Sequence, residues 1–185
     1  MTAIRPRLWK REEYHRMQEK GVINPEERVE LLEGQILQMA PKNPPHAATN
    51  LCAANLLNQR LAGKAFVRIQ DPIALSSLSE PEPDIAVVQP KKGYYSDRHP
   101  TASEIYLLIE IADTTLNFDR TQKAQIYAAT GIRDYWILDV NTNQVYVFRQ
   151  PDQGHYQEEI MLDETATISL FAFPEITIAV EQLFA

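Results

Sequence analysis

The sequence predicts an α/β protein in which helices flank one mixed β-sheet, with an N-terminal helix and hairpin and a β-rich C-terminal tail. Three observations predict this class. Apolar runs of strand length alternate with segments whose apolar residues recur at helical spacing. The run 105–112 is mostly apolar on both faces, as a central strand is. No repeat, low-complexity segment or linker divides residues 1–185, so we expect one domain.

Composition narrows the class of protein. The 185 residues are 44% hydrophobic, which is enough for one packed core. A net charge of -7 argues against a surface coated with basic charge for nucleic-acid binding, although it allows a local basic groove. The single cysteine, Cys52, excludes an internal disulfide. The first residues lack a secretion signal and no run reaches the roughly 20 apolar residues of a membrane span, so we expect a cytoplasmic protein with no membrane partner.

The chain begins with a predicted helix and a predicted hairpin. Residues 9–20 are charged helix formers that end at Gly21. Residues 28–39 contain two short apolar runs around a Glu-Gly pair, which is typical of a hairpin whose Gly34 adopts a positive φ. Glu30 lies within the first of these strands. The alternation of residues there also allows Glu30 to face solvent.

A second helix is predicted over residues 46–63, where Gly63 ends the pattern. We expect His46, which opens this helix, to be solvated or to cap it. We expect Cys52 to pack as a small hydrophobic residue. The apolar residues at helical spacing predict the face that packs inward: Leu51, Ala54, Leu57 and Leu61.

Two strands and a loop follow. Residues 65–75 predict a strand that bends or ends at Pro72, and residues 83–88 predict the next strand, which opens with Pro83-Asp84. Residues 89–103 are rich in Lys, Gly, Tyr, Asp and Pro, which indicates a surface loop. The loop carries the cations Lys91, Lys92 and Arg98 and is the most basic short stretch outside the helices.

The second half of the chain predicts a central strand at residues 104–112 and a helix at residues 117–131. Asp119, Lys123 and Tyr127 are spaced four residues apart, so they share one side of that helix. The remaining residues predict strands, and a short helix at the end, in the segments 133–140, 144–150, 156–161, 166–170 and 173–184.

Two carboxylates stand within the apolar strands of this predicted sheet. Glu110 lies inside the central strand, and Asp84 opens the strand 83–88. An ionised carboxylate is costly to bury without a partner, so Glu110 must be protonated, ion-paired, or facing a metal or a solvated cleft. Two carboxylates on neighbouring strands suit a hard divalent cation such as Mg²⁺. Lys123, on the helix that follows the Glu110 strand, is the candidate to act on a water there.

Each of these assignments has a simpler alternative. Asp84 alternatively caps a turn through its carboxylate. Lys123 alternatively forms a surface ion pair with Asp119, which would stabilise the fold little. Asp113 and Asp119 are the kind of residues that the helix dipole favours at a helix start.

The spacing of these residues resembles the PD-(D/E)XK nucleases. Pro83-Asp84 is followed by Glu110 after 26 positions, but Ala112 stands where the usual lysine would be, and Lys123 stands on the next helix. The wider pattern is similar to a large bacterial family of restriction endonuclease-like proteins, whose lysine also comes from the helix. The matching features run from about residue 27 to residue 139: ERVELLEGQI, His46, PEPDIAVV, LLIEIADTT, Asp119, Lys123, Tyr127, Gly131 and DYWILD.

This resemblance implies the restriction endonuclease-like fold and hydrolysis of phosphodiester bonds with Mg²⁺, or alternatively Mn²⁺. It also implies a nucleic-acid substrate, with DNA expected, and a homodimer. The cations that we expect to contact the phosphates of this substrate are Lys64, Lys91, Lys92, Arg98 and Arg120. Asp84 and Glu110 would hold the metal, Ile111 would offer its main-chain carbonyl, and Lys123 would act on the attacking water. Two auxiliary residues would complete the site: Glu30 and Gln70.

Two further functions stay open at the level of the sequence. The acidic composition and the displaced lysine are also compatible with a catalytically inactive module of the nuclease fold that binds nucleic acid or a protein partner. A metal-dependent hydrolase of a small phosphoester or a nucleotide is the third reading of the same residues.

Overall fold

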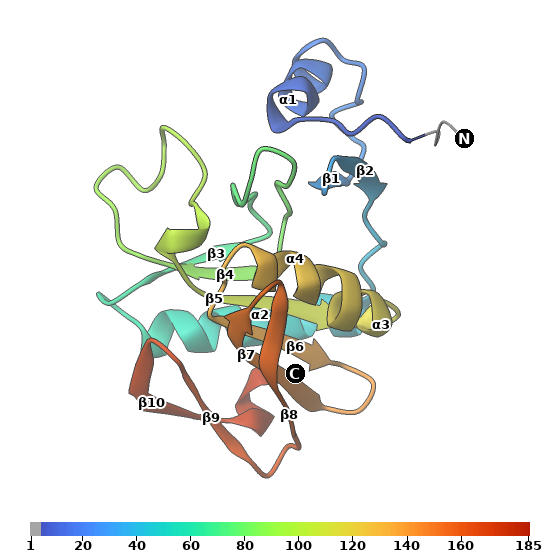
Figure 1. Cartoon of the computed structure of the whole chain (residues 1–185). Helices are drawn as coiled ribbons and strands as arrows, with labels where there is room; N and C mark the ends of the chain where they lie inside the picture. The colour runs from blue at the N-terminus through green and yellow to red at the C-terminus, as the bar shows by residue number, and fades with distance from the viewer. Residues whose placement is uncertain (1–4) are drawn as a thin grey trace.

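The structure is a computed structural model, and it describes residues 5–185. The first four residues lie outside the described residues. They are part of the segment that was expected to lack a secretion signal. Its centre is a mixed sheet with the strand order β3-β4-β5-β6-β7-β8 (Figure 1). Strands β5 and β6 are parallel, and the other neighbours are antiparallel. The strands are β3 (Phe66–Ile69), β4 (Ile85–Val88), β5 (Ile105–Ala112), β6 (Asp134–Asp139), β7 (Gln144–Asp152) and β8 (His155–Leu162).

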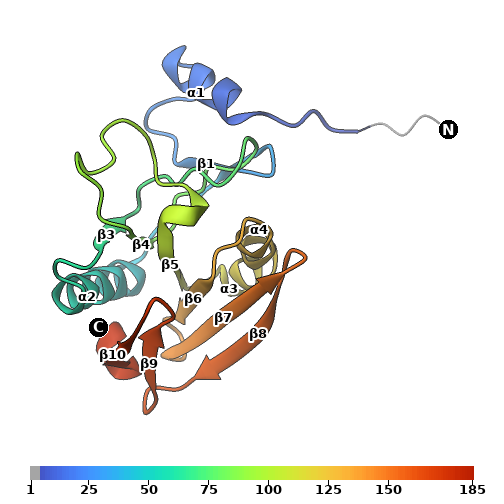
Figure 2. The ribbon, with the colours of Figure 1, turned by 60° about the vertical axis from the view of Figure 1, so that its left-hand side comes forward.

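Helices cover both faces of this sheet, as Figure 2 shows. Helix α2 (Pro44–Arg60) packs on one face. The other face is covered by one helical stretch that consists of α3 (Leu116–Phe118), a π-helical turn (Asp119–Lys123) and α4 (Ala124–Ala129). The central strand β5 divides its side chains between the two layers, with Leu107 and Ile109 toward α2 and Leu108 and Ala112 toward α4. The predicted mixed sheet with flanking helices is therefore confirmed.

The N-terminal unit stands at one end of the sheet (Figure 1). It contains α1 (Arg11–Glu19) and the hairpin of β1 (Val29–Leu32) and β2 (Gln35–Gln38). A small apolar cluster that includes Tyr14 and Leu31 joins the helix to the hairpin. The hairpin in turn pairs with the loop that precedes β4, because Glu80 N–H donates to the Leu31 carbonyl at 2.8 Å. This contact positions the hairpin beside the start of β4.

The C-terminal tail returns to the α2 side of the sheet. It consists of β9 (Thr167–Leu170), β10 (Phe173–Ala179) and a short 3-10 helix (Val180–Leu183). Leu170, Ile178 and Leu183 are buried in the same apolar cluster as α2. The predicted β-rich tail is confirmed. None of the helices in residues 5–185 combines the length and hydrophobicity of a bilayer span.

The structure differs from the expected elements at two places. Strand β3 ends before Gln70, not at Pro72, because Gln70 has a left-handed backbone with φ of +55° that a strand does not accommodate. Leu51, which was expected to face inward, is 61% exposed. The buried side of α2 runs through Asn50 and Leu57 instead, and a pattern that counts only apolar residues misses the buried polar Asn50.

The turn of the β1–β2 hairpin gives a test of this packing. Gly34 has φ of +78°, and a Cβ there would lie 2.6 Å from Leu8 Cβ; Gly63 has φ of +76° but has open space around it. We expect Gly34→Ala to lower the free energy of unfolding by about 3 kcal/mol, and Gly63→Ala by about 1 kcal/mol, because only the first adds a clash to the backbone strain. Urea unfolding measures both values. Equal losses would show that the segment around Leu8 does not hold the turn.

Candidate active site

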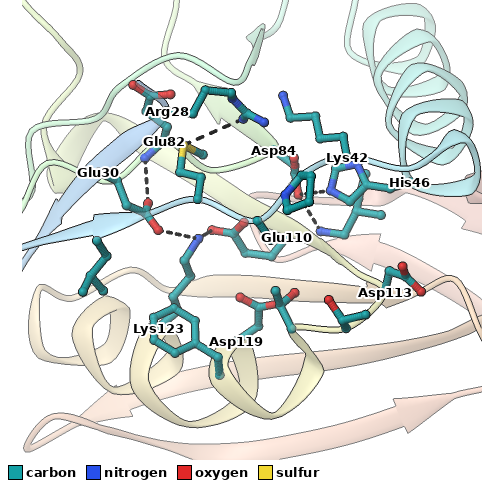
Figure 3. A pocket seen from close by; sticks show the side chains of 18 of the residues that line it. Arg28, Glu30, Lys42, His46, Glu82, Asp84, Glu110, Asp113, Asp119 and Lys123 are labelled. Carbon is teal, nitrogen blue, oxygen red and sulfur yellow. Dashed lines mark hydrogen bonds and ion pairs between the residues drawn. The ribbon is translucent and has the colours of Figure 1, made fainter. Parts of the chain in front are cut away.

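A cavity of about 350 Å³ opens at the C-terminal end of β5 (Figure 3). Three parts of the chain form its walls: residues 28–46, from the hairpin to the first turn of α2; residues 82–84, which lead into β4; and residues 110–123, from β5 into the π-helical turn. The sequence-predicted carboxylates and lysine all line this cavity.

Asp84 is held by three hydrogen-bond donors. Gln70 Nε2 donates to Oδ1 at 3.0 Å, and the Ile111 N–H donates to Oδ2 at 2.9 Å. His46 Nε2 lies 3.1 Å from Oδ2. Burial alone would raise the pKa of Asp84, but the hydrogen bond and charge of His46, with those of Gln70 and Ile111, outweigh burial and lower that pKa. Asp84 is therefore ionised, and His46 is its donor.

The expectation that His46 is a solvated or simple capping residue is therefore wrong. Asn43, not His46, caps α2, and its side chain accepts the His46 N–H at 3.1 Å. His46 lines the cavity, where its ring contacts Asp84.

One carboxylate oxygen of Glu110 accepts hydrogen bonds from two donors. Lys123 Nζ donates to Oε1 at 3.0 Å, and the Tyr127 hydroxyl donates to the same oxygen at 2.6 Å. Lys123 Nζ also lies 3.3 Å from Glu30 Oε1. Glu110 and Lys123 are 4% and 6% exposed, so this ion pair is buried. The alternative in which Lys123 forms a surface ion pair with Asp119 is wrong.

The π-helical turn places the lysine. It widens the helix by one residue per turn over Asp119–Lys123, and such turns are frequent at functional sites. Asp119, Lys123 and Tyr127 are all buried on the side that faces β5. Asp119 is thus more than a helix-start residue: it lines the cavity, and its Oδ2 accepts the Thr115 hydroxyl at 2.6 Å.

Glu30 is buried as well, which corrects the alternative that it faces solvent. Its exposed fraction is 5%, because the hairpin packs against the loop before β4. Glu30 Oε2 accepts the Glu82 N–H at 3.2 Å, while Oε1 faces Lys123. The local alternation of the strand cannot distinguish this face from a solvent face, since the partner Glu82 is 52 residues later in the chain.

The electrostatics of the cavity reflect an excess of negative charge. Burial raises the pKa of Glu110 to about 8, although Lys123 opposes the shift. Burial likewise raises the pKa of Asp119 to about 6 against the same lysine. Burial would lower the pKa of Lys123, but the carboxylates of Glu110, Glu30 and Asp119 outweigh it and raise that pKa. Several buried carboxyl groups share one ammonium, so ionising all of them together requires a further cation.

The oxygen donors of this site fit a hard divalent cation. Within residues 5–185, no group of three or more His, Cys, Asp or Glu is placed to hold a metal. Mg²⁺ needs fewer protein ligands, because it usually keeps several waters and takes one or two carboxylates. A carboxylate offers about four lone-pair positions. The recorded donors occupy three positions of Asp84 and two of Glu110, so both retain acceptor capacity.

The cations expected to contact phosphate do not line the cavity. Four of them form ion pairs elsewhere on the surface: Lys64 with Glu175, Lys91 with Asp97, Arg98 with Glu104 and Arg120 with Glu159. Two other cations, Arg28 and Lys42, line its rim. The sequence does not predict that Arg28 and Lys42 lie together, although each is near Glu30 or His46 in the chain. The docking of the hairpin brings them together.

Comparison with known proteins shows similarity to a family model and to solved structures. A family model named Uma2, described as "Putative restriction endonuclease", matches residues 11–181. A crystal structure from Anabaena variabilis, described as a putative nuclease belonging to DUF820, is similar with a TM-score of 0.70. The sequences are 20% identical, and the match covers 84% of this chain and 89% of that chain, so it shows the restriction endonuclease-like fold. No curated protein matches the chain.

The raised pKa of Glu110 predicts how stability depends on pH. The folded-state pKa of about 8 lies above the usual 4.5, so the metal-free native state binds the extra proton and loses stability as pH rises from about 4.5 to 8. We expect Glu110→Gln, which keeps an acceptor for Lys123 and Tyr127, to remove this loss. The variant should be more stable than the native protein by on the order of 2 kcal/mol at pH 8, with little difference at pH 5.

Glu104 is the matched control. Its hydrogen bonds from Arg98 lower its pKa to about 2, so its contribution is present above pH 4.5 and is lost as pH falls toward 2. Glu104→Gln should therefore be destabilising at pH 8, the opposite sign. Urea unfolding with EDTA at both pH values measures the two variants. A Glu110→Gln variant that is equally destabilised at both pH values would contradict the prediction.

Proposed function

Because the chain belongs to the Uma2 family of restriction endonuclease-like proteins, we propose that it is a Mg²⁺-dependent endonuclease that hydrolyses phosphodiester bonds of DNA. The observation that carries this proposal is the buried ammonium of Lys123, 3.0 Å from Glu110 in a cavity that Asp84 also lines. Buried charges of this kind are costly for stability, and charged groups with shifted pKa values in a cavity are typical of active sites.

Asp84 and Glu110 are the residues that would hold Mg²⁺, with the main-chain carbonyl of Ile111. The Ile111 N–H points at Asp84, and in an extended strand the C=O of a residue lies on the same edge as its N–H, which supports the third ligand. When bound, the metal supplies Lewis-acid stabilisation of the phosphate and lowers the pKa of its water. Mn²⁺, which accepts the same oxygen ligands, would substitute.

Lys123 would orient the attacking water and stabilise negative charge on the phosphate. Its pKa is raised, so it acts as an ammonium that donates hydrogen bonds, not as the group that accepts a proton. In the overall reaction the water oxygen forms a bond to phosphorus and the bond from phosphorus to the leaving sugar oxygen breaks. One water hydrogen ends on that sugar oxygen.

Glu30 and Gln70 are proposed as positioning residues. Glu30 reaches Lys123 on the side opposite Glu110, so the ammonium is held between two carboxylates. Gln70 fixes the orientation of Asp84, and its left-handed backbone is the kind of strain that is stored at functional sites. The expected homodimer and the expected single domain over residues 1–185 stay predictions.

The first test is dependence on the metal ligands. We expect Mg²⁺ titration by calorimetry to give a binding isotherm for the native protein, and about 100-fold weaker binding for Asp84→Ala and for Glu110→Ala, because each removes a charged ligand. Glu175→Gln, which alters only an exposed carboxylate paired with Lys64, should bind as the native protein does. Equal isotherms for all four proteins would favour the catalytically inactive module.

The second test is cleavage. Lys123→Met keeps an unbranched side chain of nearly the same length and removes the charge, so we expect kcat to fall by about 10²- to 10⁴-fold while Mg²⁺ binding persists. Supercoiled and single-stranded circular DNA, incubated with Mg²⁺ and resolved by electrophoresis, give the rates. Native protein that cleaves no faster than Glu110→Ala would contradict the nuclease assignment, and cleavage of small phosphoesters alone would favour the small-molecule hydrolase.

A further inference from the structure

Two cations stand together on the rim of the cavity. Arg28 precedes β1 and Lys42 precedes α2, both side chains are exposed, and Figure 3 shows their charged ends side by side. Within the part of the chain that the structure describes, neither forms an ion pair. The one recorded contact of either charged end is from Arg28 Nη2 to Met39 Sδ at 3.8 Å.

The repulsion between these two cations is offset only in part by the nearby carboxylates, of which Glu82 interacts with both cations. Burial, followed by the charge of Arg28, lowers the pKa of Lys42. The carboxylates of Glu82 and Asp84 offset this shift only in part. Two like charges held at the mouth of an anion-processing site form a receptor for phosphate, because a phosphate diester placed between them relieves their repulsion.

The groups at the floor of the cavity are recessed beneath this rim. Asp84, Glu110 and Lys123 are 9%, 4% and 6% exposed, so a phosphate must enter the cavity to reach them. A strand within a duplex is held by pairing and stacking, and extruding part of it costs that energy, which an unpaired strand does not lose. The recessed site therefore favours an unpaired strand.

The walls between rim and floor suit a nucleotide. Four apolar residues line the cavity: Leu37, Met39, Pro41 and Phe118. Apolar and aromatic surfaces of this kind receive sugars and bases of single strands without reading their sequence. A cavity of about 350 Å³ lies at the lower end of the size range of small-ligand pockets, so it suits one nucleotide better than a helix.

We propose that the substrate is an unpaired nucleic-acid strand, one nucleotide of which enters the cavity, and that Arg28 and Lys42 bind a backbone phosphate adjacent to the bond that is cut. This inference rests on the proposed nuclease function. It assigns substrate positioning to two residues that touch neither the metal ligands nor Lys123 by any recorded hydrogen bond or ion pair.

The first experiment removes the rim charges. We expect Arg28→Gln and Lys42→Gln each to raise KM for a single-stranded oligonucleotide by about 5- to 10-fold with kcat within twofold of the native value. The slope of log kcat/KM against log salt should become shallower by about 0.7 for each variant, because each removes one phosphate contact. Both residues are exposed, so the fold should persist.

Arg60→Gln is the matched control. Arg60 is an exposed cation at the far end of α2, about 20 Å along the helix from His46. It should leave KM, kcat and the salt slope unchanged. An unchanged KM and salt slope in Arg28→Gln and Lys42→Gln, or an equal change in Arg60→Gln, would overturn the assignment of the two rim residues.

The second experiment compares substrates of one sequence. We expect kcat/KM for the single strand to exceed that of the fully paired duplex by at least about 10-fold, and a duplex with an unpaired bulge to be cut at the bulge. A preference for the full duplex would overturn the unpaired-strand proposal. If cleavage still depends on Glu110, the nuclease function stands and this inference alone fails; if no substrate is cut in a Glu110-dependent way, the proposed function fails first.

Discussion

The acidic cavity of this protein depends on the ion pairs that the Lys123 ammonium forms with Glu30 and Glu110. Glu30 and Glu110 are buried on opposite sides of this ammonium, and both would be uncompensated buried charges in its absence. The lysine reaches this position because the π-helical turn Asp119–Lys123 aims it at β5. Such π-helical turns are frequent at functional sites, which agrees with the place of this turn beside the cavity.

Each layer of the fold supplies one part of the site. The central strand β5 provides Glu110, whose neighbours in the strand are anchored in both apolar clusters, so the carboxylate has little freedom to move. The start of β4 provides Asp84 with its amide and imidazole donors. The hairpin provides Glu30 and closes one wall of the cavity. The sheet therefore fixes the two strand carboxylates, while the wall depends on the smaller contact between hairpin and loop.

The sequence predicts those residues of the candidate site whose burial would be energetically costly within their own segment of the chain. Glu110 is recognisable because a charge inside an apolar strand needs a reason, and Asp84 and Lys123 follow from its spacing with neighbouring elements. The burial of Glu30 and the meeting of Arg28 with Lys42 are not predictable in this way. They result from the docking of the hairpin on a loop about 50 residues later, and no short-range pattern encodes that contact.

A net charge of -7 argues against a surface coated with basic charge, yet charge acts over a limited range. The Debye length is about 8 Å at physiological ionic strength, so exposed carboxylates on distant faces are largely screened at the cavity. Within that range, the cations Arg28 and Lys42 lie with Glu82 around the cavity that Asp84 and Glu110 also line. The local arrangement of charges at this cavity therefore matters more for a polyanion than the total charge of the chain.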